Sequence, residues 1–376
     1  MKSHQKNAAY RCATVILSAI LVIASLSMTG CSSCQSLIPN RDPQPDDTTI
    51  IQPENTDQNN SQEPKPEDEP KEDKPVLPSY YNPLTGLASE TDLSLVRPVA
   101  ICIGNTASAL SPFGLHTAEI VIEAPVEGGA TKLTILTSTY THAAQLGAVG
   151  VTRRYLQSFA AAFGAVNVCA GTSDILQSAG SSPFPAIDYA EGGLSTVFFR
   201  NEEIPDALFT SGTRLIGALE NFEKFGAKLP FSFLPYGTAA AVSDQTATGV
   251  VIPYSDTHVT QFAYDKDGQR YICSQNAAMQ ANGTNEALAF TNLLLLTCES
   301  SIHHKTTGTE FELNTENGGT GYYVSHGSYI EISWSIDENG ALQITDKDGA
   351  TIVCNRGNTY IGLIDLAESS SLLIIK

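Results

Sequence analysis

The sequence predicts a mixed α/β fold, in which an N-terminal α/β domain is followed by a smaller, strand-rich C-terminal domain. Three observations carry this prediction. Short apolar runs of strand length recur from residue 97 onward, two stretches with helical spacing lie among them, and turn pairs such as Asp-Gly punctuate the last third of the chain. We place the two domains at residues 79–237 and 238–376.

The first domain contains the apolar runs and both helical stretches. Strands are predicted at 98–103, 119–123, 132–137, 165–170 and 196–199, and helices at 154–163 and 213–225. The second domain has alternating runs around Asp267-Gly268, Asn339-Gly340 and Asp348-Gly349, each typical of a β-hairpin. Strands mixed with helices favour an α/β arrangement for the first domain.

The N-terminus has the pattern of a bacterial lipoprotein signal at residues 1–30. Lys2, Lys6 and Arg11 precede an apolar stretch that ends at Thr29-Gly30, and Cys31 follows. Cleavage before Cys31 would leave its thiol to carry lipid, and two acyl chains suffice for stable anchoring. Two alternatives remain open, an uncleaved membrane helix and simple secretion. The favoured interpretation, a cleaved lipoprotein signal, predicts a chain that is extracytoplasmic and lipid-anchored to the cell membrane.

Residues 31–78 are predicted to be a disordered, acidic, proline-rich linker tethered at Cys31. Between Arg41 and Lys74 there are 11 acidic and 4 basic residues, and the segment offers little apolar surface to bury. Proline and like charge extend such a chain. The linker would therefore hold the folded part away from the membrane.

The net charge of −19 excludes nucleic acid as a favoured ligand, because phosphate binding requires clustered lysine and arginine. The partners predicted for this chain are the membrane, through the lipid at Cys31, and an envelope protein or wall component. No cofactor and no metal is predicted. His303-His304 lacks ligands at zinc spacing and is interpreted as a solvated pair.

Six cysteines remain besides Cys12 and Cys31. An even number in an exported chain is compatible with disulfides, but several of these residues lie in apolar, strand-like runs where cysteine behaves as a small buried hydrophobe. We favour buried thiols and leave disulfides open for Cys34, Cys102, Cys169, Cys273, Cys298 and Cys354.

A family resemblance is carried by the start of the predicted first domain. The motifs are Asn-Pro-Leu-Thr-Gly-Leu at 82–87, Arg-Pro-Val-Ala-Ile at 97–101 and Glu-Ala-Pro-Val-Glu-Gly-Gly at 123–129. The chain resembles the YerB-like lipoproteins of the DUF3048 family. The resemblance implies a signal, a linker and two domains, and it implies no activity. Gly150 and Asp206 stand where members usually carry arginine and histidine.

Four polar side chains are predicted to gather at strand and helix ends of the first domain. Glu123 and Glu127 flank a strand end, Asn105 ends another strand, and Arg153 begins a helix. Members of the resembled family tend to have Pro-His after a Trp-Arg or Phe-Arg pair, and this chain has Phe199-Arg200 followed by Pro205-Asp206. Arg200 of that pair completes the candidate ligand-binding set. The alternative interpretation is structural, with Arg153 pairing a glutamate to fix a turn.

Two functions follow from this set. The favoured one is a non-enzymatic envelope lipoprotein that binds a ligand or protein partner. The alternative is an envelope hydrolase or transferase that uses Glu123 and Glu127 as an acid/base pair. The Ser-His-Gly-Ser segment at 325–328 resembles a transpeptidase motif, but serine replaces the cysteine nucleophile, and we interpret it as coincidence.

Overall fold

The structure is a computed structural model that describes residues 79–105, 113–173, 184–191, 195–202, 204–221, 234–238, 240–280, 286–305 and 308–376. The predicted signal, Cys31 and the predicted linker lie outside these residues. Among the described residues, no helix is long and apolar enough to cross a membrane.

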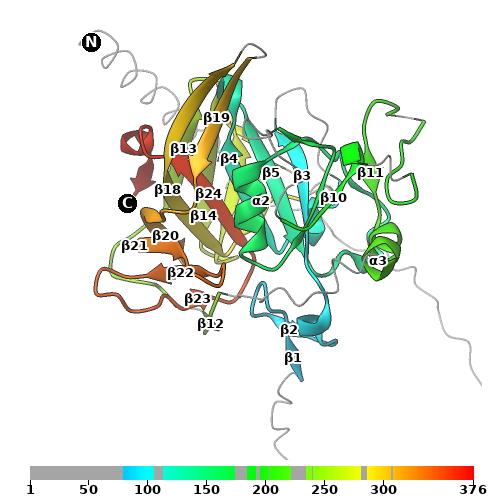
Figure 1. The fold of residues 1–376 in the computed structure, drawn as a ribbon. Coiled ribbons are helices and arrows are strands. Elements are labelled where there is room, and N and C mark those ends of the chain that lie inside the picture. The colour runs from blue at the N-terminus through cyan, green and yellow to red at the C-terminus, as the bar shows by residue number, and fades with distance from the viewer. Residues whose placement is uncertain are drawn as a thin grey trace, which may run out of the picture. The chain divides into compact units, whose positions relative to one another are not determined.

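One large sheet runs through the described part of the chain and contains strands from both halves of the sequence (Figure 1). Its order is β10 (Ala186–Asp188), β8 (Val166–Cys169), β3 (Val99–Asn105), β5 (Thr131–Thr137), β4 (Ile120–Pro125), β24 (Thr359–Asp365), β18 (Asn292–Lys305), β20 (Gly319–Ser325), β21 (Ser328–Ile336) and β22 (Leu342–Thr345), with β19 (Gly308–Asn314) paired to the far end of β18. The central strands read as continuous apolar runs because both of their faces are buried.

A second sheet is built only from the C-terminal half. It contains β16 (Ala278–Met279), β15 (Arg270–Gln275), β14 (His258–Asp265), β13 (Gly249–Ser255) and β25 (Leu373–Ile375), with β17 (Ala289–Phe290) paired to β15. The β14–β15 hairpin turns at the Asp267-Gly268 pair, as the sequence predicts.

The remaining elements are short. Four two-stranded pairs are formed by β1 (Tyr80–Tyr81) with β2 (Ala88–Ser89), β6 (Leu146–Gly147) with β11 (Phe209–Thr210), β7 (Thr152–Arg153) with β9 (Thr172–Ser173), and β12 (Tyr236–Gly237) with β23 (Cys354–Asn355). The described helices are α2 (Arg154–Ala161) and α3 (Gly212–Asn221), with 3-10 turns η1 (Leu93–Leu95), η2 (Leu115–Thr117), η3 (Glu127–Gly129), η4 (Tyr140–His142), η5 (Tyr189–Glu191) and η6 (Ser369–Ser371).

Two apolar cores lie on opposite faces of the large sheet. One is shared with the second sheet, where Phe262 packs 4.7 Å from Tyr360 between ring centroids. The other is covered by α2, whose Phe159 ring lies 5.8 Å from Trp334. Fully burying one such aromatic side chain contributes about 1.5–3 kcal/mol. Both cores therefore stabilise the contacts between strands that lie far apart in the sequence.

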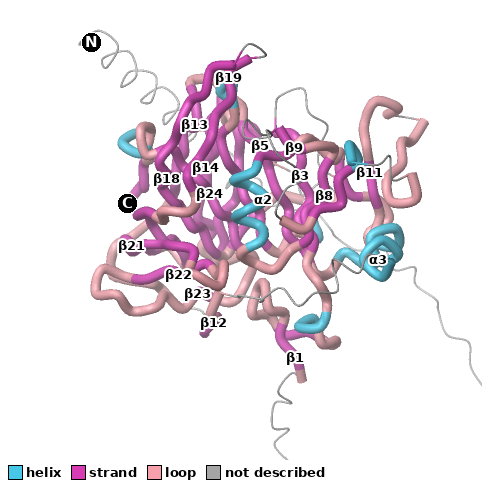
Figure 2. Tube along the Cα trace, viewed as in Figure 1, coloured by secondary structure: helices cyan, strands magenta, loops and turns pink. Residues whose placement is uncertain are grey.

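The predicted α/β fold class is wrong, because the protein is mostly β. Figure 2 shows that strands dominate the described chain, and the two described α-helices have 8 and 10 residues. An α/β domain needs parallel strands joined by crossover helices. Here β3, β5 and β4 pair antiparallel, and only η3 connects β4 to β5.

Individual elements were predicted better than their arrangement. Strands at 98–103, 119–123, 132–137 and 165–170 correspond to β3, β4, β5 and β8, and α2 begins where the first helix is predicted. The predicted strand at 196–199 is reduced to a single bridge between Phe199 and Phe209. Apart from that strand, the error lies in how the strands are connected and paired.

Candidate functional site

Glu123 lies in the interior, inside β4 and not at its end. Its side chain is 2% exposed and accepts hydrogen bonds at both oxygens. Asn105 Nδ2 lies 3.1 Å and Thr131 Oγ1 2.7 Å from Oε1. Asn105 ends β3 and Thr131 begins β5, so three neighbouring strands of the large sheet supply these groups.

The other partners of Glu123 come from the C-terminal half of the chain. His258 Nε2 lies 3.0 Å from Oε1, and Tyr360 Oη donates to Oε2 at 2.8 Å. Thr260 lies two residues after His258 on β14, so its side chain points to the same face of the strand. Its Oγ1 lies 2.9 Å from Glu123 Oε2. Sequence reasoning missed all three, because nothing local marks a residue as the partner of a glutamate more than 130 positions away.

The space beside this carboxylate is small. A cavity of about 20 Å³ touches Glu123, Asn105, Gln275 and Tyr360, which is room for little more than one water molecule. The Glu123 cluster thus joins the large sheet to the second sheet through satisfied hydrogen bonds. Its geometry is that of a buried polar network, which rigidifies a core when every member is paired.

Glu127 and Arg153 form a partly buried ion pair, with side chains that are 31% and 10% exposed. The Arg153 guanidinium donates from Nε to Glu127 Oε2 at 3.2 Å and from Nη2 to Oε1. Burial alone would raise the pKa of Glu127, but the hydrogen bonds and charge of Arg153 outweigh it and lower that pKa. The pair fixes the η3 turn, in which Gly128 and Gly129 adopt φ of 78° and 77°.

A groove of about 460 Å³ opens beside this turn. One side is the end of β4 and η3, and the other side is the hairpin formed by the far part of β18 and β19. Its described lining includes three carboxylates and no lysine or arginine, with apolar side chains between them. These residues are Pro125, Val126, Glu127, Gly128, Gly129, Tyr254, Ile302, Thr309, Phe311, Asp365 and Glu368.

Arg200 does not join the other candidate residues. Its guanidinium donates to the backbone carbonyl groups of Pro205 and Asp206, at 3.3 and 2.7 Å. These bonds stay within its own loop. The structure therefore brings Asn105 to Glu123 and Glu127 to Arg153, and places Arg200 in neither group.

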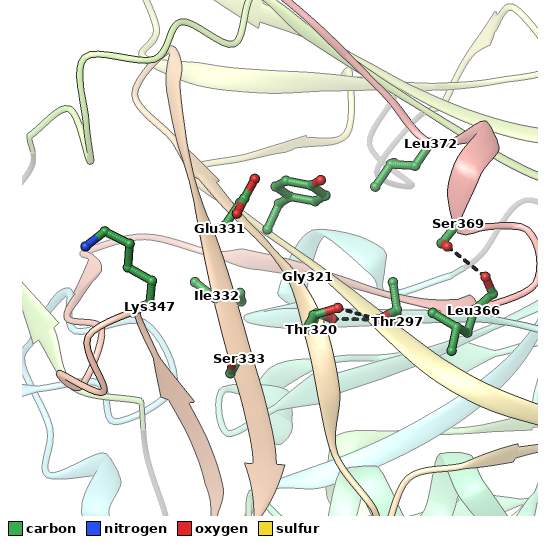
Figure 3. Close-up of a pocket in the computed structure, with 11 residues that line it drawn as sticks. Thr297, Thr320, Gly321, Glu331, Ile332, Ser333, Lys347, Leu366, Ser369 and Leu372 are labelled. Atoms are coloured by element: carbon green, nitrogen blue, oxygen red, sulfur yellow. Dashed lines mark hydrogen bonds between the residues drawn. The ribbon is translucent and has the colours of Figure 1, made fainter.

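A second pocket of about 360 Å³ lies on the β18–β20–β21 part of the sheet (Figure 3). Thr297 donates to the Thr320 carbonyl at 2.8 Å along its floor. At the rim, Lys347 is paired with Asp348 and points away from the threonine pair. None of the predicted site residues lines this pocket.

Two motifs singled out in the sequence are structural. The Ser325–Ser328 segment is the turn between β20 and β21, where the Ser328 hydroxyl donates to the Ser325 carbonyl at 3.0 Å. His303 pairs with Glu312 at 3.5 Å, and the neighbouring His304 contacts Thr309. Within the described ranges, no three His, Cys, Asp or Glu side chains are grouped as metal ligands.

The cysteines of the folded part are free thiols. Cys102, Cys169, Cys273, Cys298 and Cys354 are all buried and unpaired with one another. Burial raises the pKa of Cys298 and of Cys354 to about 12. Cys34 lies outside the described residues.

Comparisons with known proteins agree with the resemblance seen in the sequence. Residues 84–225 match the N-terminal domain and residues 250–361 the C-terminal domain of DUF3048, described as a protein of unknown function. The chain belongs to the DUF3048 family. It is 27% identical over 301 residues to the Bacillus subtilis protein called "Putative lipoprotein YerB", covering 77% of this chain and 88% of that one.

The fold is also similar to that of a solved relative. The crystal structure of YerB from Bacillus subtilis superimposes with a TM-score of 0.65 at 25% identity, covering 79% of this chain and 99% of that chain. The likeness extends over both matched domains, so the β-rich architecture is shared with that relative.

Proposed function

We propose that this protein is a lipid-anchored extracytoplasmic protein that binds a ligand or protein partner through the groove beside Glu127. The lipoprotein pattern ending at Cys31 and the name given to the Bacillus subtilis relative support the anchor. The acidic linker would present the folded part to partners in the envelope.

The observation that carries the binding function is the composition of the groove. It combines about 460 Å³ of space with carboxylates of Glu127, Asp365 and Glu368 and with the apolar side chains of Ile302 and Phe311. Ile302 is 60% exposed, so its side chain is accessible to a partner in the groove. Exposed apolar surface rimmed by charge is typical of an interaction site.

The acid/base alternative has no observation in its favour. Glu123 borders the cavity of about 20 Å³, whereas Glu127 borders the groove, so the two carboxylates line different spaces. Glu127 is also held by Arg153. A general acid and its partner base must both reach the reacting group, and we therefore favour binding over catalysis.

The proposal is tested by photo-crosslinking in intact bacteria that express the full chain. The photoreactive residue p-benzoylphenylalanine replaces Ile302 in one variant and Val353, which is 56% exposed and outside the groove, in the matched control. We expect a discrete adduct from position 302, identified by mass spectrometry, and none from position 353. Equal labelling, or no adduct at 302, overturns the proposal.

A further inference from the structure

The large sheet has an unfilled strand position at the groove. β24 lies between β18 and β4 and ends at Asp365, which pairs with Cys298. β18 continues for seven more residues, Glu299 to Lys305, and on that stretch it pairs only with β19. Figure 1 shows β18 and β19 extending together beyond the end of β24. Within the described part of the chain, no strand occupies the edge of β18 that β24 leaves.

The backbone groups on this edge can be assigned from the ladder. The Leu366 amide donates to the Cys298 carbonyl at 2.8 Å, which is the last bond from the β24 side. Successive residues of a strand point their amide and carbonyl groups to alternate edges. Ser300, Ile302 and His304 therefore turn these groups toward the open edge, where no described residue bonds to them.

The groove described above lies beside the open edge. Where β24 lies between β18 and β4, the strand spacing of about 4.8 Å places those two strands about 9–10 Å apart. β4 ends at Pro125, and beyond Asp365 the groove is bordered by Ile302 of β18 and by Val126 and Glu127, which follow β4.

We propose that this opening binds an extended, basic peptide segment of a partner protein, which adds to β18 as a strand in line with β24. The inference rests on the proposed function, because it names the ligand class of the same groove. Free amide and carbonyl groups select a peptide backbone, as in other cases of strand addition. The carboxylates of Asp365 and Glu368 favour lysine or arginine, and Ile302 and Phe311 favour apolar side chains between them.

Charge argues against occupants from this chain itself. The predicted linker carries 11 acidic against 4 basic residues over Arg41–Lys74, and the chain has a net charge of −19. Its linker and a second copy would both bring negative charge to a groove lined by carboxylates. A seven-residue basic segment, about 23 Å long when extended, matches the free length of β18.

The test measures fluorescence anisotropy of a labelled Lys-Val-Lys-Val-Lys-Val-Lys peptide with the full chain in zwitterionic detergent. We expect saturable binding, at least tenfold weaker for Ile302→Pro than for Ile302→Ala. Both variants lose the side chain, but only proline removes the amide that faces the open edge, where proline is tolerated. Glu368→Gln should weaken binding severalfold, and Glu338→Gln, at an exposed turn outside the groove, should not.

Peptide variants test strand addition without changing the protein. In an added strand, only every second peptide amide would face β18. Methylating one alternating set of amides should therefore weaken binding at least tenfold, whereas methylating the other set should not. A peptide with glutamate in place of lysine should not bind. Binding that ignores both methylation patterns and Ile302→Pro overturns the inference as non-specific charge attraction. The photo-crosslinking experiment described above separates the two proposals. If no peptide binds but p-benzoylphenylalanine at position 302 still gives a discrete adduct in cells, strand addition is refuted and the proposed function stands. If position 302 gives no adduct, the proposed function is refuted.

Discussion

His258 Nε2 lies 3.0 Å from Glu123 Oε1 in the interior of the protein, with side chains that are 6% and 2% exposed. The two residues belong to different sheets, β14 and β4. Together with Asn105, Thr131, Thr260 and Tyr360, they connect the N-terminal and C-terminal halves of the chain through one carboxylate.

Removing this carboxylate should destabilise the protein strongly. Glu123→Ala leaves the surrounding donors buried without their acceptor, and breaking such a network costs about 3–5 kcal/mol of unfolding free energy. Chemical denaturation of the full chain measures the effect, with the exposed Glu338→Ala as a control expected to change stability by less than about 0.5 kcal/mol. A loss below about 1 kcal/mol for Glu123→Ala would contradict the structural role assigned here.

Glu119 should make the stability depend on pH. Burial raises its pKa above the ordinary 4.5, although Ser138 donates two groups to the carboxylate and Asn82 a third. The folded state therefore binds the proton more tightly than the unfolded state, and stability falls as pH rises from 4.5 toward the raised pKa. Below 4.5 both states are protonated and the penalty is absent.

The Glu119→Gln variant isolates this effect. The difference between the unfolding free energy of the variant and that of the original protein should increase as pH rises above 4.5, because the amide cannot ionise and the variant does not share this loss of stability. Denaturation at several pH values between 4 and 7 gives the difference curve. A flat curve would show that ionisation of Glu119 does not contribute.

The five buried thiols should be unreactive in the native protein. Burial keeps Cys298 and Cys354 protonated, with pKa values raised to about 12, and also raises the pKa of Cys102, Cys169 and Cys273. Because the thiolate is the nucleophile, maleimide should modify these residues only after denaturation. Peptide mass spectrometry assigns each site, and a disulfide between any two would appear as a pair that reacts only after reduction.

Cys31 should carry the lipid. Cells fed an alkyne-bearing fatty acid should label the full chain, and Cys31→Ala should abolish the label whereas Cys34→Ala should retain it. Two acyl chains on this one residue would suffice for stable membrane attachment. Labelling that survives Cys31→Ala would refute this lipidation site.

The local elements of this fold could be predicted from the sequence, but their assembly could not. The apolar run at 98–103 defines β3 and the helical spacing after Arg153 defines α2, because side-chain periodicity is a property of neighbouring residues. The pairing of Thr359 with Ile120 depends on segments 239 positions apart. Such a pairing leaves no pattern in the local sequence. The order and direction of the strands therefore could not be predicted, and the α/β prediction missed the antiparallel connection between β4 and β5.

The candidate site likewise contains residues that could be predicted from the sequence and residues that could not. Asn105 and Glu123 share a hydrogen bond because adjacent strands place them side by side, and Glu127 meets Arg153 at a turn that the Gly128-Gly129 pair indicates. Arg200 was chosen from a motif, and its contacts are with its own loop. His258 and Tyr360 were absent from the predicted set because only the packing of the two sheets brings them to Glu123.

The sequence by itself determined the family, the positions of β3, β4, β5, β8 and α2, and the pattern that predicts an anchor at Cys31, since each depends on residues close together in the chain. Only the tertiary structure decided that the two halves share one sheet, that Glu123 is a buried link between layers, and that β24 ends before β18. The physical reason is that strand pairing and burial satisfy backbone and polar groups across long sequence distances. Among the described residues, the edge at Ser300, Ile302 and His304 is open because β24 ends earlier than β18.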